Sequence, residues 1–226
     1  MIKNISNLGD SALYCDFGKE VNKEINSNVI SYFNGIKEKN IYGITNLTPS
    51  YNKLIITFDL NLTNFDDLKE KIKNIKPKIY DNAENKKIKI PLCCEKEFML
   101  DKKSLESKLN NSIEEILKNF FVKEYFCYMT GFIAGMPFLG DIDKKIQTKR
   151  LETPRVKVPK GSIGITEQFC NIYTFESPGG WNIIGNTPVK IFDKSNFLRP
   201  ALINPGDKVS FYKISKKEYE NWNEKK

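Results

Sequence analysis

The absence of histidine limits the chemistry that this chain of 226 residues can perform. Catalytic arrangements of the Ser-His-Asp or Cys-His type, and metal sites built on imidazole, are excluded together. Any reaction must therefore use carboxylates, lysine, arginine, tyrosine, hydroxyl groups or backbone amides. Such groups are of most interest where the sequence also predicts a strained or exposed backbone.

The stretch SPGGWNIIG, residues 177–185, places two adjacent glycines between a proline and one of only two tryptophans. Glycine loses more backbone entropy on folding than any other residue, so this pair needs a physical reason. One interpretation is a corner or turn where only glycine fits and Trp181 packs in the core. The other is a backbone that approaches a ligand closely. The sequence leaves both open.

The cysteines do not indicate a metal site or a disulfide framework. They are an odd, scattered set: Cys15, Cys93, Cys94, Cys127 and Cys170. Adjacent Cys93 and Cys94 lack CxxC spacing, and no four thiolates are placed to hold zinc. We therefore expect buried, reduced thiols and no metal bound by this chain.

The net charge of +8 is spread from Lys3 to Lys226 and mixed with acidic residues. A nucleic-acid-binding protein is expected to gather its charge in one stripe, so we interpret these residues as a solvated surface without a nucleic-acid partner. A basic face for an anionic ligand or an acidic protein partner stays open. The chain has no run of 18 apolar residues and its first residues lack a signal-peptide pattern. We therefore expect no membrane association and a cytoplasmic location.

Residues 1–84 are expected to form a small α/β domain. Strand patterns at 12–17, 41–47 and 54–58 alternate with two apolar stripes of helical spacing. Asn64 is expected to cap the second helix, which Pro77 ends. The order is β-α-β-β-α, with a further strand before or after. The polar segment 80–87 is interpreted as a linker.

Residues 85–226 are expected to form a second domain rich in β structure. A capping box at Ser112 begins a helix that runs to about Phe121. The window 131–188 holds eight of the 13 glycines, and short strands between such turns favour a barrel or a sandwich. The charged segment 216–226 is expected to fray. Strands are expected at 87–92, 125–129, 189–192 and 208–212.

Four stretches of the second half, in this order, carry a family resemblance. They are GFIAGMPFLG (131–140), TPRVKVPKGSIGI (153–165), SPGGWNIIGNTP (177–188) and PGDKVSF (205–211). These resemble the patterns GFxPGFPYLG, TPRxxVPxGSVGI, SPGGWxxIGRTP and PGDxVxF of the allophanate hydrolase subunit 1 family. Residues 11–18 and 48–54 are similar to the opening strand of that family and to its PSYxSL turn, so the resemblance covers nearly the whole chain.

The resemblance implies an α+β protein with a ferredoxin-like N-terminal domain and a cyclophilin-like β-barrel. The family includes the B subunit of bacterial 5-oxoprolinase, which acts with A and C subunits to hydrolyse 5-oxoproline to glutamate with ATP. That activity is the function implied first. The alternatives are a KipI-type inhibitor that binds a sensor histidine kinase, or a non-catalytic subunit of an allophanate hydrolase or urea carboxylase-like assembly. ATP is expected to be bound mainly by a partner protein, because this chain has no Walker A loop.

The implied chemistry, opening of a phosphorylated lactam, needs anion recognition and oxyanion stabilisation. Arg155 is the expected anion ligand, because its planar fork matches a carboxylate or phosphate. The backbone amides of Gly179 and Gly180 are expected to form a nest for an anion, beside the strand of Arg155 on the barrel and facing a polar hollow. The catalytic candidates are Arg155, Tyr173 and Ser177, and the substrate-binding candidates are Thr153, Gln168, Gly179, Gly180 and Trp181.

The sequence departs from the family pattern at several positions. Phe120 stands where relatives commonly have histidine, and Phe169 and Cys170 stand at the family's glutamine and threonine. Either Gln168 compensates from the neighbouring position or the polar contact is lost. Compensation is not automatic, because a shift of one residue along a strand places the side chain on the opposite face of the sheet. We interpret these changes as an altered pocket, which favours a binding role over full activity.

Overall fold

The computed structural model describes residues 1–77 and 85–222. The chain divides into two compact units, Met1–Glu84 and Asn85–Lys226. Of the segment interpreted as a linker, residues 80–84 lie outside the described residues. Lys86 belongs to the second unit, because its backbone amide donates to the Asp207 carboxylate at 2.9 Å.

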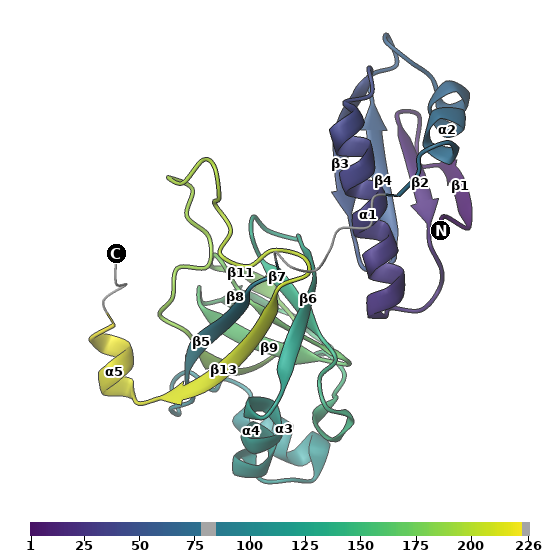
Figure 1. Ribbon diagram of the computed structural model, residues 1–226. Coiled ribbons are helices and arrows are strands. Elements are labelled where there is room, and N and C mark those ends of the chain that lie inside the picture. The colour runs from purple at the N-terminus through teal and green to yellow at the C-terminus, as the bar shows by residue number, and fades with distance from the viewer. Residues whose placement is uncertain (78–84, 223–226) are drawn as a thin grey trace. The chain divides into compact units, whose positions relative to one another are not determined.

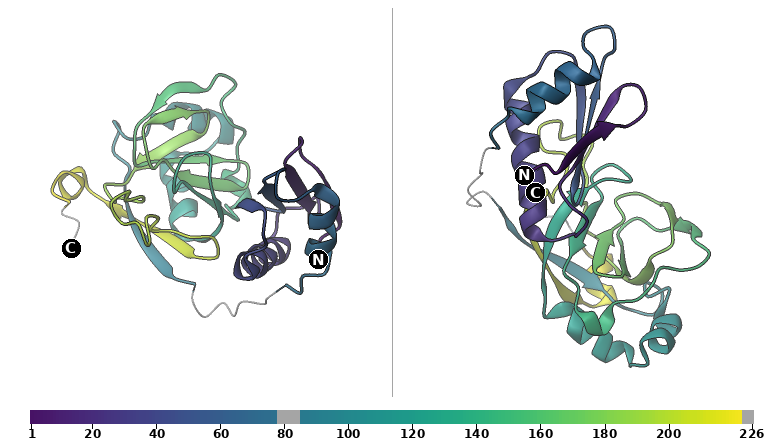
Figure 2. Two further views of the ribbon diagram at one scale, coloured as in Figure 1. Left: turned by 90° about the horizontal axis from the view of Figure 1, so that it is seen from above. Right: turned by 90° about the vertical axis from the view of Figure 1, so that its right-hand side faces the viewer.

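The N-terminal unit is a four-stranded antiparallel sheet with two helices on one face (Figures 1 and 2). The strands lie in the order β1-β2-β4-β3. The predicted order β-α-β-β-α is present, and the further strand precedes it. The elements are β1 (Asn4–Asn7), β2 (Ala12–Asp16), α1 (Lys23–Lys39), β3 (Ile44–Pro49), β4 (Lys53–Phe58) and α2 (Phe65–Lys73).

Asparagine side chains set the ends of these helices. Asn22 Oδ1 accepts from the Ile25 amide at 2.9 Å and so begins α1. Asn64 Oδ1 accepts from the Asp67 amide at 3.0 Å, which confirms the predicted cap of α2. Asn40 ends α1 in the left-handed region with a φ of 43°. The apolar faces between these caps pack on the sheet and form the core of this unit.

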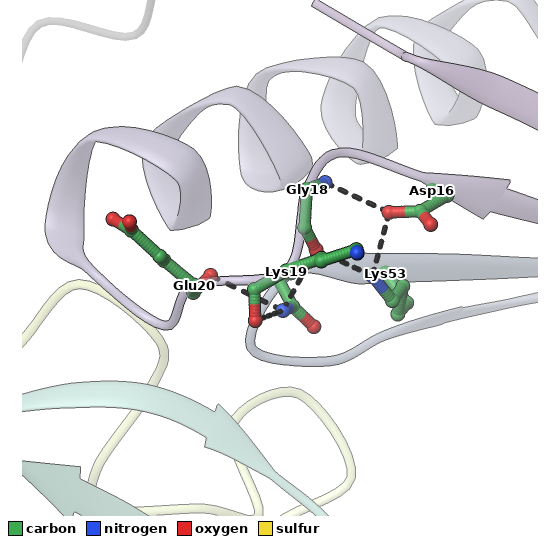
Figure 3. A network of polar contacts seen from close by, with 6 residues as sticks. Asp16, Gly18, Lys19, Glu20 and Lys53 are labelled. Carbon is green, nitrogen blue, oxygen red and sulfur yellow. Dashed lines mark hydrogen bonds and ion pairs between the residues drawn. The ribbon is translucent and has the colours of Figure 1, made fainter.

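A polar network fixes the turn from β2 into α1 (Figure 3). Asp16 Oδ1 accepts from Lys53 Nζ at 2.6 Å and from the Gly18 amide at 2.8 Å. Lys53 also donates to the Gly18 carbonyl at 2.5 Å. The hydrogen bond from Lys53 holds the pKa of Asp16 below its usual value. The network therefore ties the start of β4 to the end of β2.

The C-terminal unit is built on a closed seven-stranded barrel (Figure 1), which decides between the two predicted architectures. The strands lie in the order β10-β7-β6-β13-β5-β12-β9. The first and last of them in the chain, β5 and β13, pair in parallel from Lys87↔Lys208 to Cys93↔Ile214. The barrel strands are β5 (Lys87–Cys93), β6 (Glu124–Thr130), β7 (Pro137–Gly140), β9 (Ser162–Thr166), β10 (Phe169–Ile172), β12 (Asn182–Asn186) and β13 (Lys208–Ile214).

Two helices, α3 (Lys102–Leu109) and α4 (Ile113–Phe121), follow β5 and lie at one end of the barrel (Figure 1). The Ser112 hydroxyl accepts from the Glu115 amide at 3.3 Å and caps α4 at the predicted residue. The reciprocal half of the predicted capping box is replaced, because the Ser112 amide donates to Asn111 Oδ1 at 2.9 Å. The apolar face of α4 then enters the barrel core. There the Phe120 ring lies 5.0 Å from the ring of Phe211. A short 3-10 helix, Lys144–Ile146, follows β7.

Two local predictions are wrong. Residues 189–192 form no strand, and only an isolated bridge, Phe192↔Ala201, joins their end to the returning chain. Pro200 on that returning chain has no amide to donate, which limits further pairing. Residues 190–201 instead extend from the barrel as an arm (Figure 1). The expected frayed end contains α5 (Lys216–Glu220), because a capping box fixes its start.

The strands β8 (Arg155–Val158) and β11 (Ser177–Gly179) form a separate two-stranded ribbon. Arg155 pairs with Gly179, and Val158 pairs with Ser177. The arginine and the glycine therefore lie side by side as expected, but on this ribbon and not on a barrel strand.

All five cysteines are buried and unpaired, which confirms the prediction of buried thiols. Burial raises the pKa of Cys15 and of Cys94 to about 12, so these thiols stay protonated at neutral pH. Over residues 1–77 and 85–222, no helix has the length and apolar character needed to cross a bilayer.

Candidate functional site

A pocket of about 310 Å³ lies beside the β8–β11 ribbon. Its wall is mostly aromatic and apolar, with a few polar groups and the glycine pair. The lining residues are Phe132, Met136, Phe138, Arg150, Pro154, Asn171, Tyr173, Pro178, Gly179, Gly180 and Trp181. Four of the predicted site residues lie here: Tyr173, Gly179, Gly180 and Trp181. We call this hollow the aromatic pocket.

Crowding explains the first glycine of the pair. A Cβ at Gly179 would overlap the hydroxyl and the ring of Tyr173. Neither glycine of the pair is among the residues with positive φ, so a left-handed backbone is not the reason. A Cβ at Gly180 would lie 3.2 Å from Nη2 of Arg150. This contact is tight, but the Arg150 side chain is flexible and could move away. Gly179 therefore allows a close approach, and the approaching group is the phenol of Tyr173.

Tyr173 places a buried hydroxyl in the wall of the pocket. The residue is 1% exposed, and burial raises its pKa. Hydrogen bonding to the Asn171 side chain and to the Trp181 backbone opposes that shift in part. Asn171 is fixed in turn, because its Oδ1 accepts from the Gly164 amide at 3.2 Å. The Tyr173 phenol is protonated at neutral pH, so it can donate a hydrogen bond but cannot serve as a general base.

Aromatic rings form the apolar walls. The Trp181 ring meets the Phe138 ring edge to face, with centroids 5.5 Å apart. Phe132 stands at the rim, 71% exposed and with a φ of 67°. Walls of this kind suit a small ring or a short carbon chain, and the polar groups between them would orient it.

Arg150 is the cationic residue of this pocket, and the sequence analysis missed it. Its neighbours in the chain are anchored, because Asn182 donates to the Lys149 carbonyl at 3.0 Å and the Leu151 amide donates to the Gly180 carbonyl at 2.7 Å. Among the described residues, no carboxylate lies within ion-pair distance of its exposed guanidinium. The Lys-Arg pair before the TPR stretch is the one signal of this residue in the sequence, and the even spread of charge favours a solvated surface for it.

Arg155, the expected anion ligand, has a different position. Its Nη2 forms an ion pair with Asp101 Oδ1 at 2.5 Å, and the Asp101 side chain is only 4% exposed. The other oxygen of Asp101 accepts from the Ile183 amide at 2.6 Å. Arg155 therefore joins β8 to the start of α3 and to β12, and it does not line the aromatic pocket.

The three remaining candidates lie outside the pocket lining. The Ser177 hydroxyl is buried and has no hydrogen-bond partner among the described residues. Thr153 is exposed and lines a neighbouring cleft. Gln168 lies in the turn between β9 and β10, where its carbonyl accepts from the Ile142 amide at 3.1 Å. The catalytic role predicted for Ser177 and the substrate-binding roles predicted for Thr153 and Gln168 stay predictions.

The positions interpreted as an altered pocket do not line it either. Phe120 and Cys170 are fully buried in the barrel core. Phe169 packs its ring against Tyr128, with centroids 6.0 Å apart. The apolar character of Phe120 and Cys170 therefore fits core packing, and Phe169 is half-buried against an aromatic neighbour. In the part of the chain that the structure describes, no three Cys, Asp or Glu side chains are grouped to hold a metal ion.

Residues 3–203 match the family model of the carboxyltransferase domain, subdomains C and D. The 5-oxoprolinase B subunit of Bacillus subtilis is 33% identical over 97% of this chain and 96% of its own length. The crystal structure of TTHA0988 superposes over 90% of this chain with a TM-score of 0.79 and 25% identity, and this chain spans 40% of it. The K. lactis urea amidolyase has the same fold, with a TM-score of 0.81, 19% identity and 96% of this chain covered, and this chain spans 15% of it.

Proposed function

Because this chain belongs to the carboxyltransferase subdomain C and D family, which includes the 5-oxoprolinase B subunits, we propose that it is the B subunit of an ATP-dependent 5-oxoprolinase. It would hydrolyse 5-oxoproline to glutamate in the cytoplasm, together with A and C subunits. ATP would be bound mainly by a partner. We also assign the N-terminal sheet and helices to the ferredoxin-like fold. The full-length similarity to a 5-oxoprolinase B subunit supports the proposal.

The aromatic pocket is the observation that carries the proposal on the structural side. It combines a small apolar space for a ring, a protonated phenol on Tyr173 and a cation on Arg150. 5-Oxoproline is a five-membered ring with a carboxylate and a lactam carbonyl. In our proposal Arg150 pairs with the carboxylate, and Tyr173 donates to the carbonyl oxygen as negative charge develops on it. Arg155 acts at a distance, by holding Asp101 and α3.

Exposed apolar residues on the pocket rim, on the adjacent ribbon and in the arm support work within a complex. The pocket rim contributes Phe132, and Val156 on the adjacent ribbon is 81% exposed. In the arm, Phe197 and Leu198 are 92% and 95% exposed. Apolar surface of this kind marks protein contacts when several such residues lie on neighbouring segments. A partner protein of the complex would cover it and close the pocket.

The test is reconstitution with candidate A and C subunits, with glutamate release from 5-oxoproline and ATP as the readout. We expect activity only with all three proteins present. Tyr173→Phe should lower kcat by about 100–1,000-fold, since it removes one donor to a developing charge. Lys71→Gln, an exposed change in the other unit, is the matched control. A complex that is inactive with this chain but active with its Bacillus subtilis relative would refute the enzymatic role.

A further inference from the structure

A second hollow, of about 700 Å³, lies between α3 and the irregular segment that precedes β8. We call it the basic cleft. Most of its lining residues have polar or charged side chains: three cations, one acid, three hydroxyl groups and an amide. The lining residues are Ser104, Lys108, Gln147, Thr148, Lys149, Arg150, Leu151, Glu152 and Thr153. Arg150 lines this cleft and the aromatic pocket as well, so the two hollows share one residue.

The described residues do not neutralise the positive charge of the basic cleft by ion pairs. Lys108 Nζ donates to the amide oxygen of Asn182 at 3.0 Å, a neutral acceptor. Across residues 1–77 and 85–222, no ion pair engages Lys108, Lys149 or Arg150. Glu152 is the one acid of the lining. Three cations against one carboxylate favour an anion in this space.

The walls of the basic cleft are held in place before any ligand arrives. Asn182 joins them, because its Oδ1 accepts from Lys108 on α3 and its Nδ2 donates to the Lys149 carbonyl. The Thr148 carbonyl accepts from the Glu167 amide at 2.7 Å. Because these contacts fix both sides, a ligand would not have to order the backbone on binding.

We propose that the basic cleft binds the phosphoryl group of a small organic phosphate whose organic part occupies the aromatic pocket. Arg150 would bridge the two parts, and Lys149, Lys108 and the hydroxyl groups would contact the phosphoryl oxygens. The site itself follows from the lining of the two hollows. The identity of the ligand rests on the proposed function, in which ATP activates a lactam and so supplies a phosphorylated organic compound to this protein.

Calorimetry on the full chain distinguishes a site that binds only the phosphoryl group, in the basic cleft, from a site that spans the basic cleft and the aromatic pocket. The first probe is inorganic phosphate, which reports on the basic cleft alone. The second is phenylphosphonate, whose ring can enter the aromatic pocket. We expect phenylphosphonate to bind about tenfold more tightly than phosphate, because the ring adds apolar burial. Trp181→Ala should remove this advantage and leave phosphate binding unchanged.

Charge variants locate the site. Lys149→Gln and Arg150→Gln should each weaken phosphate binding by about tenfold, since each removes a charge-assisted contact. Lys71→Gln, with the same change of charge in the N-terminal unit, should leave it unchanged. Equal affinity in all variants, or equal losses in all three charge variants, would overturn the proposal. So would equal affinity for the two probes.

The outcome is independent of the enzymatic assay. A chain that binds phenylphosphonate at this site but supports no glutamate release would keep the site and refute the proposed function. An active complex in which this chain binds neither probe would keep the proposed function and refute the site.

Discussion

Arg150 and Arg155 stand five positions apart in the sequence, yet their surroundings differ in kind. Arg155 is paired with a carboxylate that is 4% exposed and that also accepts from a backbone amide. Arg150 is exposed between two hollows, and no carboxylate of the described chain is within ion-pair distance. A charge in a buried pair holds elements together, whereas an unpaired cation beside a pocket is available to a ligand. The residue type favours anion binding for both arginines, and the surroundings are the reason that our proposal assigns this role to Arg150 and not to Arg155.

The largest expected effect tests the structural half of this comparison. Arg155→Ala should lower the free energy of unfolding by about 3 kcal/mol, because it leaves the buried Asp101 carboxylate without its cation. Urea unfolding followed by circular dichroism gives the value. Arg150→Ala is the matched control and should change stability by less than about 0.5 kcal/mol. Equal losses in the two variants would contradict the distinction between the arginines.

The glycine pair offers a second contrast. Gly179→Ala should cost about 2 kcal/mol, because the new methyl group overlaps the Tyr173 side chain and something must shift. Gly180→Ala should cost less, since its nearest neighbour is the flexible end of Arg150. In the Tyr173→Phe background the cost of Gly179→Ala should fall, because the closest overlapping atom is gone. Additive losses would show that crowding by the phenol is not the cause.

The functional half is tested by Arg150 in the reconstituted complex. Arg150→Gln should lower kcat/KM for 5-oxoproline by about 10–30-fold, which corresponds to the loss of one charge-assisted contact. The kcat/KM of Arg150→Lys should lie between those of Arg150→Gln and the wild type, because lysine keeps the charge but not the planar fork. Unchanged kcat/KM in Arg150→Gln would remove Arg150 from the proposed site.

The smallest effect concerns the ion pair of Asp16 with Lys53 in the N-terminal unit, whose carboxylate is more exposed than that of Asp101. The pKa of Asp16 is lowered in the folded state, so its contribution is present above the unfolded-state pKa and is lost as the pH falls through the folded-state pKa. Asp16→Asn should therefore cost about 0.5–1 kcal/mol at pH 7. The difference from wild type should vanish in acid, where Asp16 is protonated in both states. A difference that persists at low pH would assign the loss to another cause.

Short-range sequence patterns predict the helices and strands, whereas the surroundings of the candidate site residues depend on contacts between residues far apart in the sequence. The caps at Asn64 and Ser112 depend on residues three positions away, so the sequence indicates both. Helix α3 has no side-chain cap and no acidic residue in its first turn, and its boundaries were not foreseen. The partner of Arg155 lies 54 residues away, at the start of that same helix. The position of Arg150 depends on a segment without regular structure, which no periodicity describes.

The parallel pairing of β5 with β13 bears on the order in which this protein can fold during synthesis. β5 is the first barrel strand in the sequence and β13 is the last. The edge of β5 that pairs with β13 therefore stays unpaired until residue 214 has left the ribosome. An uncovered edge in a nascent chain is a template for pairing with other chains. The N-terminal unit needs no later strand and can be complete much earlier. Translation speed over the codons of β13 should consequently influence the yield of folded protein more than translation speed over the codons of the N-terminal unit.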